Sequence, residues 1–302
     1  MKGPLVSVVV TTKNEERNIE NCLRSIREQS YPWLETIVVD NFSTDATRRI
    51  ALRYGANVAT RGPERSAQRN WGMATMSAGA YVMYVDADMI LGPTVVEECV
   101  RTIEGDSCVA LYIPEIVLGT TCLCRVRRYE RSFYDGTVID AARFFRKDVF
   151  VETGGFNESM SGPEDWDLDN RIGREGRIRL VGPSAFTGGG AIENWSFYRF
   201  ISENGGDPGK NRAAIFHNES KLGLIDYLTK KAYYSDSISQ YAKKWGDTDA
   251  CRKQLGFFYR YFLVFVQNGN WKKILRNPVL ALGMLVARVA VGAVYMTKKI
   301  TT

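Results

Sequence analysis

Short segments rich in Val and Ile alternate with segments of helical periodicity over the first 88 residues, and this alternation constrains the fold most strongly. Ile19, Leu23 and Ile26 recur at helical spacing, and a second helix is predicted over residues 66–76. The predicted strands begin at Val6, Glu35, Asn57 and Tyr81. Strands and helices alternating at this spacing favour an α/β fold, in which a mostly parallel sheet has helices on both faces.

Polar side chains stand where the predicted strands end. Thr11 closes the first strand, Asp40 closes the second, and Asp86 and Asp88 follow the apolar run that begins at Tyr81. Parallel strands have their carboxyl ends at one edge, where open α/β sheets bind ligands. In a strand, Asp86 and Asp88 point to the same face, and hard divalent cations prefer such oxygen ligands. The alternative is an Asp-rich turn after an ordinary strand.

The order of these pieces resembles that of the family 2 glycosyltransferases, which have the GT-A, Rossmann-like fold. The resemblance covers residues 5–185. The matching segments are residues 8–15, 38–45, 65–70, 86–88, 154–156 and 164–168. The resemblance implies an inverting enzyme that uses a UDP- or GDP-linked sugar donor and Mn²⁺ or Mg²⁺.

The resemblance also assigns roles to single residues. The residues assigned to the nucleotide are Thr11, Asn14, Glu15, Asp40, Arg69 and Asp86. Among them, Thr11 and Asp40 would touch the base, and Asp86 the ribose side. Asp88 would hold the metal that bridges the diphosphate.

Chemistry gives independent reasons for a metal and for a base. A metal on a carboxylate neutralises the nucleoside diphosphate that develops as leaving group. Inversion in one displacement requires a base within reach of the acceptor hydroxyl. Asp165 is our candidate, with Glu164 and Trp166 beside it as candidate acceptor contacts. The alternative is that these acids merely favour a helix N-terminus. Asp167 and Asp169 are expected to face solvent or to support the site.

His217 is the only histidine in the chain and ends a short apolar segment. Members of the resembled family sometimes place a metal-ligating histidine after such a strand, so we expect His217 to bind the metal. An imidazole beside carboxylates would favour Mn²⁺ over Mg²⁺. The alternative is an ordinary surface or core histidine.

The last 82 residues differ from the rest in charge and hydropathy. From Lys221 onward there are 14 Lys or Arg and 4 Asp, whereas residues 1–220 have 26 Lys or Arg and 30 Asp or Glu. The tail also has two apolar stretches, residues 255–266 and 278–296. We therefore predict a GT-A catalytic domain over 1–220 and a helical membrane-associating appendage over 221–302.

The position of Arg288 within the second apolar stretch disfavours a spanning helix. We expect helices that lie in or dip into the membrane interface, with Trp271 and lysine pairs as anchors. The alternative is a helical subdomain that packs on the catalytic core or on a dimer partner.

A membrane-seated tail favours a lipid-linked acceptor, such as a polyprenyl phosphate or diphosphate glycan. The basic, aromatic segment 124–134 contains Arg128 and Arg131, which are candidate contacts for an acceptor phosphate. If the acceptor nucleophile is itself a phosphate, Asp165 would orient it rather than deprotonate it. Nucleic-acid binding is not expected, because the apolar stretches of the tail fit lipid better.

The six cysteines include no C-x-x-C pair and are expected to be mostly reduced, packing residues. No signal peptide is recognised at the start of the sequence, so we expect the cytoplasmic face of a membrane, with peripheral or monotopic attachment through residues 255–300. No Q-x-x-R-W motif follows Asp165, which favours one sugar per encounter. Glycine-rich residues 184–191 are expected to form a loop that closes over substrate.

Two other functions compete with this one. A sugar nucleotidyltransferase would use a similar sheet and metal, but it would need a glycine-rich loop after the first strand, which residues 11–15 lack. A non-catalytic sugar-nucleotide-binding membrane scaffold is disfavoured because Asp88 and Asp165 are both present.

Overall fold

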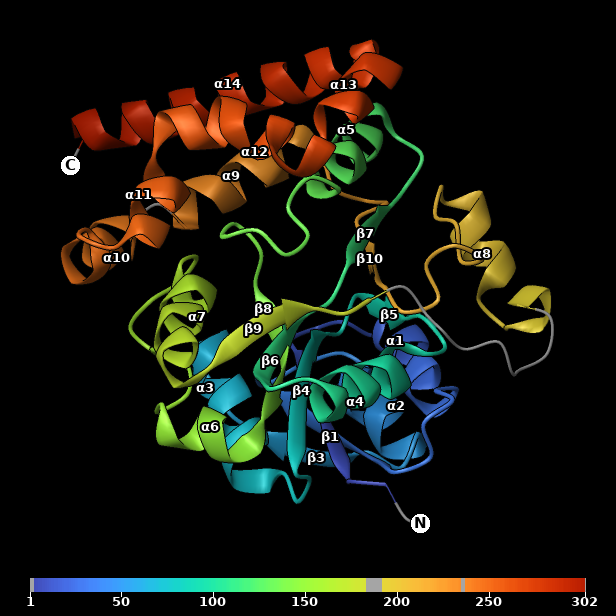
Figure 1. Ribbon diagram of the computed structural model, residues 1–302. Helices are drawn as coiled ribbons and strands as arrows, with labels where there is room; N and C mark the ends of the chain where they lie inside the picture. The colour runs from blue at the N-terminus through green and yellow to red at the C-terminus, as the bar shows by residue number, and fades with distance from the viewer. Residues whose placement is uncertain (1–2, 183–191, 235–236, 302) are drawn as a thin grey trace.

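The computed structural model describes residues 3–182, 192–234 and 237–301, with side chains described up to residue 294. A central sheet with the strand order β3-β2-β1-β4-β8-β6-β9 forms its middle layer (Figure 1). The strands are β1 Val6–Thr12, β2 Leu34–Asp40, β3 Asn57–Thr60, β4 Tyr81–Asp86, β6 Cys108–Tyr112, β8 Ala142–Arg146 and β9 Arg177–Leu180. The glycine-rich residues 184–191 lie outside the described residues.

The first four strands of this order run parallel, as the sequence predicts, and β8 is antiparallel to both β4 and β6. Every residue of β1 is buried. Its alternate side chains enter two different cores, since Val8 and Val10 pack on one face of the sheet and Val9 on the other. A strand covered on both faces reads as an uninterrupted apolar run, which is why the sequence identifies it.

Helices cover both faces of the sheet (Figure 1). Those of the N-terminal α/β region are α1 Ile19–Arg27, α2 Thr47–Arg53, α3 Arg65–Asn70 with its π-helical continuation η1 Trp71–Met76, α4 Val95–Gly105, α5 Cys122–Arg131, α6 Lys147–Glu152, α7 Glu164–Glu175 and α8 Tyr198–Glu203. The predicted α/β fold is therefore confirmed. The predicted helix over 66–76 corresponds to α3 and η1.

A smaller sheet crosses the carboxyl edge of the central one. Its strands are β5 Met89–Leu91, β10 Ile215–Asn218 and β7 Glu115–Leu118, in that spatial order. β10 is antiparallel to β5, and His217 stands opposite Met89. This pairing brings the single histidine next to the end of β4, although 129 residues separate it from Asp88.

The C-terminal region is helical, as the sequence predicts. Its elements are α9 Leu224–Tyr234, α10 Ile238–Trp245, α11 Asp249–Leu255, η4 Tyr259–Leu263, α12 Val264–Val266, η5 Gln267–Gly269, α13 Trp271–Arg276 and α14 Pro278–Thr301. Within the described residues no helix is long and apolar enough to cross a bilayer. The apolar stretch 278–296 lies along α14, above the N-terminal α/β region (Figure 1).

The C-terminal helices also pack on the N-terminal α/β region. Val126 and Phe133, from α5 and the turn after it, share a core with Val264, Phe265 and Met284. The inner side of the C-terminal region therefore agrees with the alternative prediction, a helical subdomain that packs on the rest of the protein. All six cysteines are free and five are buried, consistent with packing roles.

Candidate active site

One buried guanidinium joins the end of β4 to the start of α7. Arg69, on α3, is 2% exposed and donates to Asp86 Oδ1 and to Asp165 Oδ1, each at 3.1 Å. Its guanidinium carbon lies 4.0 Å from the centre of the Tyr84 ring. Asp86, which the resemblance assigns to the nucleotide, and Asp165, the candidate catalytic base, are therefore held together by the Arg69 side chain.

The cations around Asp86 keep it ionised. Burial by itself would raise the pKa of Asp86, but Arg69 and Arg143 outweigh burial and hold this pKa well below its usual range. Glu164 behaves in the opposite way, because burial and the neighbouring Asp165 raise its pKa against the effect of Arg65. Arg65 donates to Glu164 Oε1 at 3.0 Å.

Asp165 lies in the first turn of α7 and is partly open to solvent, with 26% of its side chain exposed. The Tyr84 hydroxyl donates to Asp165 Oδ1 at 3.0 Å, so this oxygen accepts from both Tyr84 and Arg69. Glu164, by contrast, is buried. Trp166 points away from solvent, and its indole N–H donates to Ile139 O at 3.2 Å. Among these three consecutive residues, Asp165 is the best placed to meet a substrate.

Of the two alternatives given for Asp167, the structure excludes the solvent-facing one. Its side chain is fully buried, and it accepts from Trp245 Nε1 at 2.8 Å and pairs with Lys244 at 2.6 Å. It therefore links α7 to the C-terminal helix α10. No local pattern in the sequence indicates a partner so distant in the chain.

Thr11 and Asp40 stand at neighbouring strand ends, as predicted. Thr11 Oγ1 donates to Asp86 Oδ1 at 3.3 Å. Asp40 is buried; its Oδ2 accepts from the Ser43 backbone N–H at 3.0 Å, and its Oδ1 has no hydrogen-bond partner. A buried acceptor without a partner is rare in proteins. An N–H donor of a nucleotide base would satisfy this oxygen.

Asn14 and Glu15 tie together the two loops that follow β1 and β2. The Asn14 backbone N–H donates to Ser43 Oγ at 2.8 Å, and Asn14 Oδ1 accepts from the Thr44 N–H at 2.8 Å. Asn14 adopts a left-handed conformation with φ of 54°, which Asn tolerates better than most residues. The Glu15 N–H donates to Thr47 Oγ1. Both residues shape the rim beside Asp40.

Asp88 and His217 meet at the edge between the two sheets. His217 Nε2 lies 3.1 Å from Asp88 Oδ2, and His217 Nδ1 lies 3.1 Å from Glu115 Oε1. Burial lowers the pKa of His217, but Asp88 and Glu115 outweigh it and leave this pKa well above its usual range. For Glu115, burial by itself would raise the pKa. Arg131 and Arg143 outweigh this effect and hold the pKa of Glu115 well below its usual range.

Asp88 and His217 fit a divalent metal ion. Asp88 Oδ1 is buried without a hydrogen-bond partner, which leaves one carboxylate oxygen ready for a ligand. Glu115 on the far nitrogen of His217 matches the carboxylate–histidine arrangement that orients metal-binding imidazoles. Within the residues that the structure describes, no group of three or more His, Cys, Asp or Glu side chains could hold a metal ion.

The two arginines predicted to contact an acceptor are engaged within the protein. Arg128 donates to the backbone carbonyls of Val117, Gly119 and Asn204. Arg131 pairs with Asp140 at 2.9 Å and with Glu115. Through Glu115, Arg131 supports the histidine of the candidate metal site.

Three residues of the site were missed by the sequence analysis: Tyr84, Glu115 and Arg143. Tyr84 had a signal, since alternation along β4 places residues 84 and 86 on the same side. Glu115 and Arg143 had none, because β7 and β8 approach the site only through the pairing of their sheets.

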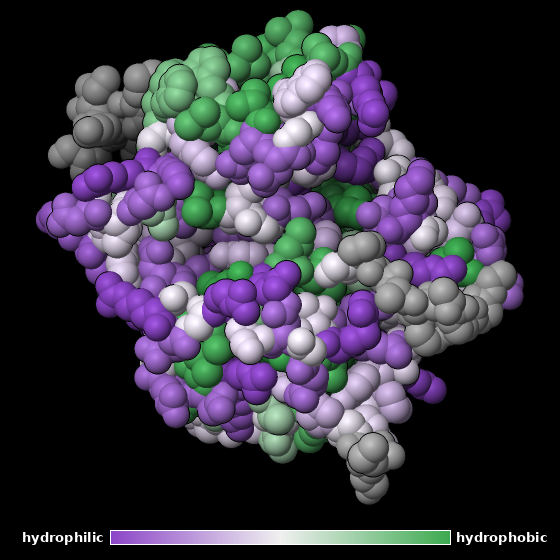
Figure 2. Space-filling view, in the orientation of Figure 1, coloured by the Kyte–Doolittle hydropathy of each residue, from purple (hydrophilic) through white to green (hydrophobic). Residues whose placement is uncertain are grey.

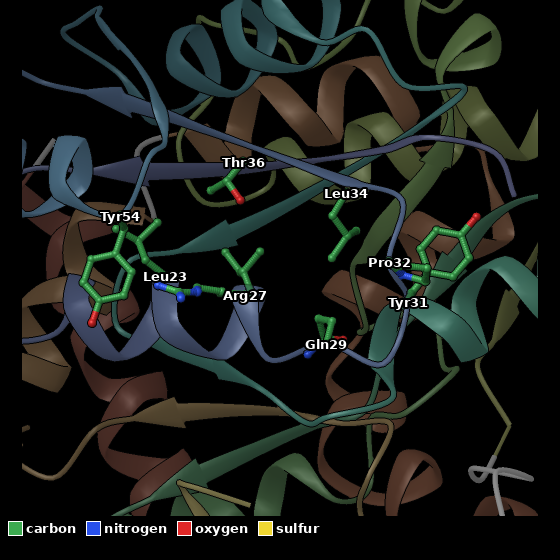
Figure 3. Close-up of a pocket in the computed structure, with 9 residues that line it drawn as sticks. Leu23, Arg27, Gln29, Tyr31, Pro32, Leu34, Thr36 and Tyr54 are labelled. Carbon is green, nitrogen blue, oxygen red and sulfur yellow. The ribbon is translucent and has the colours of Figure 1, made fainter. Parts of the chain in front are cut away.

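A separate hollow lies beside the first half of β2, away from the carboxyl edge of the sheet (Figure 3). It has a volume of about 270 Å³ and is lined from α1 and β2 by side chains that include Leu23, Arg27 and Thr36. Thr36 belongs to the first half of β2, whereas Asp40 ends that strand. No carboxylate lines the hollow, so we assign the chemistry to the carboxyl edge.

Residues 7–151 match the family described as glycosyl transferase family 2. Among curated proteins, the chain is 27% identical over 192 residues to a chondroitin synthase of Escherichia coli; this match covers 59% of the chain and 28% of that protein. It is 33% identical over 111 residues to glycosyltransferase AglE of Haloferax volcanii, covering 34% of the chain and 36% of the relative. The chain thus spans about a third of the length of these relatives.

The fold is shared with solved glycosyltransferase structures. A mannosyltransferase from Pyrobaculum calidifontis, in complex with GDP-Man and Mn²⁺, aligns with a TM-score of 0.57 at 17% identity, covering 97% of the chain and 87% of that protein. Residues 1–349 of S. aureus TarS, in complex with UDP-GlcNAc, align with a TM-score of 0.52 at 18% identity, covering 95% and 81%. At these identities the likeness establishes a GT-A-like fold.

Proposed function

We propose that this protein, whose residues 7–151 match glycosyl transferase family 2, transfers a sugar from a nucleotide-diphosphate sugar to an acceptor with inversion. The observation that carries the proposal is the Arg69 guanidinium, which is shared between Asp86 and Asp165 at 3.1 Å each. It sets the candidate base beside the nucleotide edge of the sheet. Proximity of this kind is what a single displacement requires.

The nucleotide would lie across the ends of β1, β2 and β4. The unpartnered Asp40 Oδ1 would accept from an N–H of the base, and Asp86 would accept from the ribose. Arg69 is buried against Tyr84 and has fixed partners, so it keeps Asp86 ionised and oriented. The related structures were solved with a UDP-linked and a GDP-linked sugar, so both remain candidate donors here.

Asp88 and His217 would hold a Mn²⁺ or Mg²⁺ ion. When bound, the ion would neutralise the charge that develops on the leaving nucleoside diphosphate. Glu115 would fix the ring of His217, and Arg131 and Arg143 would hold Glu115 in place. A nitrogen ligand beside a carboxylate favours Mn²⁺.

Asp165 would act as the base. The acceptor oxygen forms a bond to the anomeric carbon, the bond from that carbon to the diphosphate oxygen breaks, and the acceptor proton moves to Asp165. Tyr84 and Arg69 each donate a hydrogen bond to Asp165 Oδ1 and so orient its carboxylate. Glu164 is buried beside it and would hold Arg65 in place rather than contact the acceptor.

The acceptor in this proposal is lipid-linked. The support is the apolar, cationic C-terminal region, which packs beside the candidate site through α5 and α7. If the lipid acceptor presents a phosphate as nucleophile, no proton has to be removed, and Asp165 would orient it. The catalytic region would then work at the cytoplasmic face of a membrane.

Isothermal titration with UDP and GDP, with and without Mn²⁺, tests the donor site first. We expect one nucleotide to bind in a metal-dependent way, and Asp88→Ala to lose the metal dependence. Asp165→Asn should keep that binding but lower turnover of the matching nucleotide sugar by about 10³-fold. Absence of binding for every nucleoside diphosphate in the panel contradicts the proposal.

A further inference from the structure

The C-terminal helices expose most of the large apolar side chains on the surface of the described protein. The exposed members of this region are Phe257, Phe258, Phe262, Leu263, Val266, Trp271, Leu275, Val279, Leu282, Leu285, Val286 and Val289, which we call the apolar face. Figure 2 shows hydrophobic side chains gathered along the upper edge of the molecule, where α12, α13 and α14 lie. Exposed apolar patches of this kind mark sites of interaction.

Helix α14 contributes the longest part of the apolar face. Val279, Leu282, Val286 and Val289 recur at intervals of three and four residues, so they share one side of the helix. These four are between 59% and 81% exposed. On the opposite side, Met284 is buried in the core shared with α5. A helix that is apolar on both sides requires apolar surroundings on both, and the protein supplies only one of them.

The charged residues in the segment that contains the apolar face are all positive. Residues 255–302 contain seven Lys or Arg and no Asp or Glu. Lys272 and Arg276 are exposed on α13, beside the exposed Trp271. A surface of apolar side chains flanked by cations and Trp matches the boundary between acyl chains and anionic headgroups. A second copy of the chain would bring the same cations and no acids to balance them.

The charged side chain near the middle of α14, Arg288, does not lie on this exposed side of the helix. Arg288 is buried and donates to Glu130 Oε1 at 2.9 Å and to the Tyr134 hydroxyl at 2.5 Å. The arginine that disfavours insertion in the sequence is thus neutralised inside the protein. What the helix presents outward is uncharged over the span from Val279 to Val289.

We propose that the apolar face docks on an anionic lipid bilayer, with α14 in the plane of the interface and Lys272 and Arg276 at the headgroups. α14 lies flat along the molecule rather than projecting from it (Figure 1), so the contact is along its side. This inference deepens the proposed function, since it gives a lipid-linked acceptor a place to arrive. The docking proposal rests on the exposed apolar side chains and the cations beside them. A vesicle-binding assay can therefore contradict docking without contradicting sugar transfer, and the reverse.

Flotation with vesicles of phosphatidylcholine and phosphatidylglycerol tests the proposal on the full chain. The double variant Leu282→Glu/Val286→Glu should bind at least about 100-fold more weakly than the wild type, because two apolar contacts become charged. The matched control is Leu52→Glu/Val151→Glu, which adds the same charge at exposed apolar positions on α2 and α6. The control should float like the wild type.

A second variant isolates the charge contribution. Lys272→Gln/Arg276→Gln should weaken binding to the anionic vesicles by about tenfold or more, with little change on pure phosphatidylcholine. Nucleotide titration of each variant separates loss of docking from loss of folding. The cationic variant keeps the proposal testable if the glutamate variant fails to fold.

Two outcomes overturn the proposal. One is vesicle binding that is equal for the wild type and for a folded Leu282→Glu/Val286→Glu variant. The other is a wild type that ignores vesicles but sediments as a dimer, with the same variant sedimenting as a monomer. The second result would assign the apolar face to another copy of the chain.

Discussion

At the scale of single residues, the Tyr84 hydroxyl is the contact whose removal is most informative. It donates to Asp165 Oδ1, the oxygen that Arg69 also holds. Tyr84→Phe should lower kcat about tenfold while leaving the KM for the donor almost unchanged, because a hydrogen bond to a charged group is lost.

Tyr81→Phe is the matched control for this variant. Tyr81 lies on the same strand, but its hydroxyl contacts Glu104 and its ring packs in the core on the other face of the sheet. It should leave kcat and KM unchanged. A Tyr84→Phe enzyme with a normal kcat and a raised KM would show that Tyr84 shapes the donor pocket instead of orienting Asp165.

A second residue-scale prediction concerns Asp135, which follows α5. Burial and the neighbouring Asp140 raise the pKa of Asp135 to about 7, against the opposing effects of Arg131 and Lys273. The folded protein therefore keeps a proton that the unfolded chain releases above about pH 4. Stability from this group is fully present below that pH and is lost as the pH rises through 7.

Asp135→Asn should remove this dependence. The free energy of unfolding, measured in urea, should rise by about 2 kcal/mol at pH 8 and by clearly less at pH 5. Asp249→Asn, at an exposed acid on α11, is the control and should change little at either pH. An equal gain for Asp135→Asn at both pH values would contradict this assignment.

At the scale of elements, α5 and α14 are joined by a buried ion pair. Arg288 on α14 and Glu130 on α5 are each less than 10% exposed. Arg288→Met should lower the free energy of unfolding by about 3 kcal/mol, because Glu130 is left buried without its cation. Glu130→Gln/Arg288→Met should recover part of this loss.

Urea unfolding of the wild type, both single variants and the double variant measures the coupling. Arg252→Met, at an exposed cation on α11, controls for the loss of a positive charge. If the double variant were as unstable as the sum of the two single variants, the pair would not be coupled in the way that the structure indicates.

The elements also show what could be predicted from the sequence. β1 and β4 are read from their apolar runs because both of their faces are buried, and Asp40, Asp86 and Asp88 follow because they end strands. The partners of these residues could not be read in the same way. Glu115 reaches His217 only because β7 and β10 pair across 102 residues of chain.

The same limit explains the C-terminal region. Composition identifies α14 as apolar, but the burial of Arg288 depends on Glu130, which lies 158 residues earlier. The sequence alone therefore predicted a more exposed Arg288 side chain than the structure has. Periodicity reports which side chains share a face, whereas tertiary contacts decide which face is covered.

At the scale of the whole molecule, the catalytic region and the C-terminal helices share cores and polar contacts. Asp167 is buried on α7 and relies on Lys244 and Trp245 of α10. Val126 and Phe133 rely on residues of α12 and α14. A chain that ends at residue 220 would leave an uncompensated buried carboxylate and an uncovered apolar surface.

We therefore expect residues 1–220 alone to lose cooperative unfolding and metal-dependent nucleotide binding, even though every residue of the candidate site lies within them. Urea unfolding followed by circular dichroism, together with nucleotide titration, compares this fragment with the full chain. Lys244→Gln in the full chain is the control, because it weakens one contact and should reduce stability without abolishing binding. If residues 1–220 unfolded cooperatively and bound nucleotide with full affinity, the boundary at 220 predicted from charge would be a true domain boundary. The C-terminal helices would then not be needed to stabilise the candidate site.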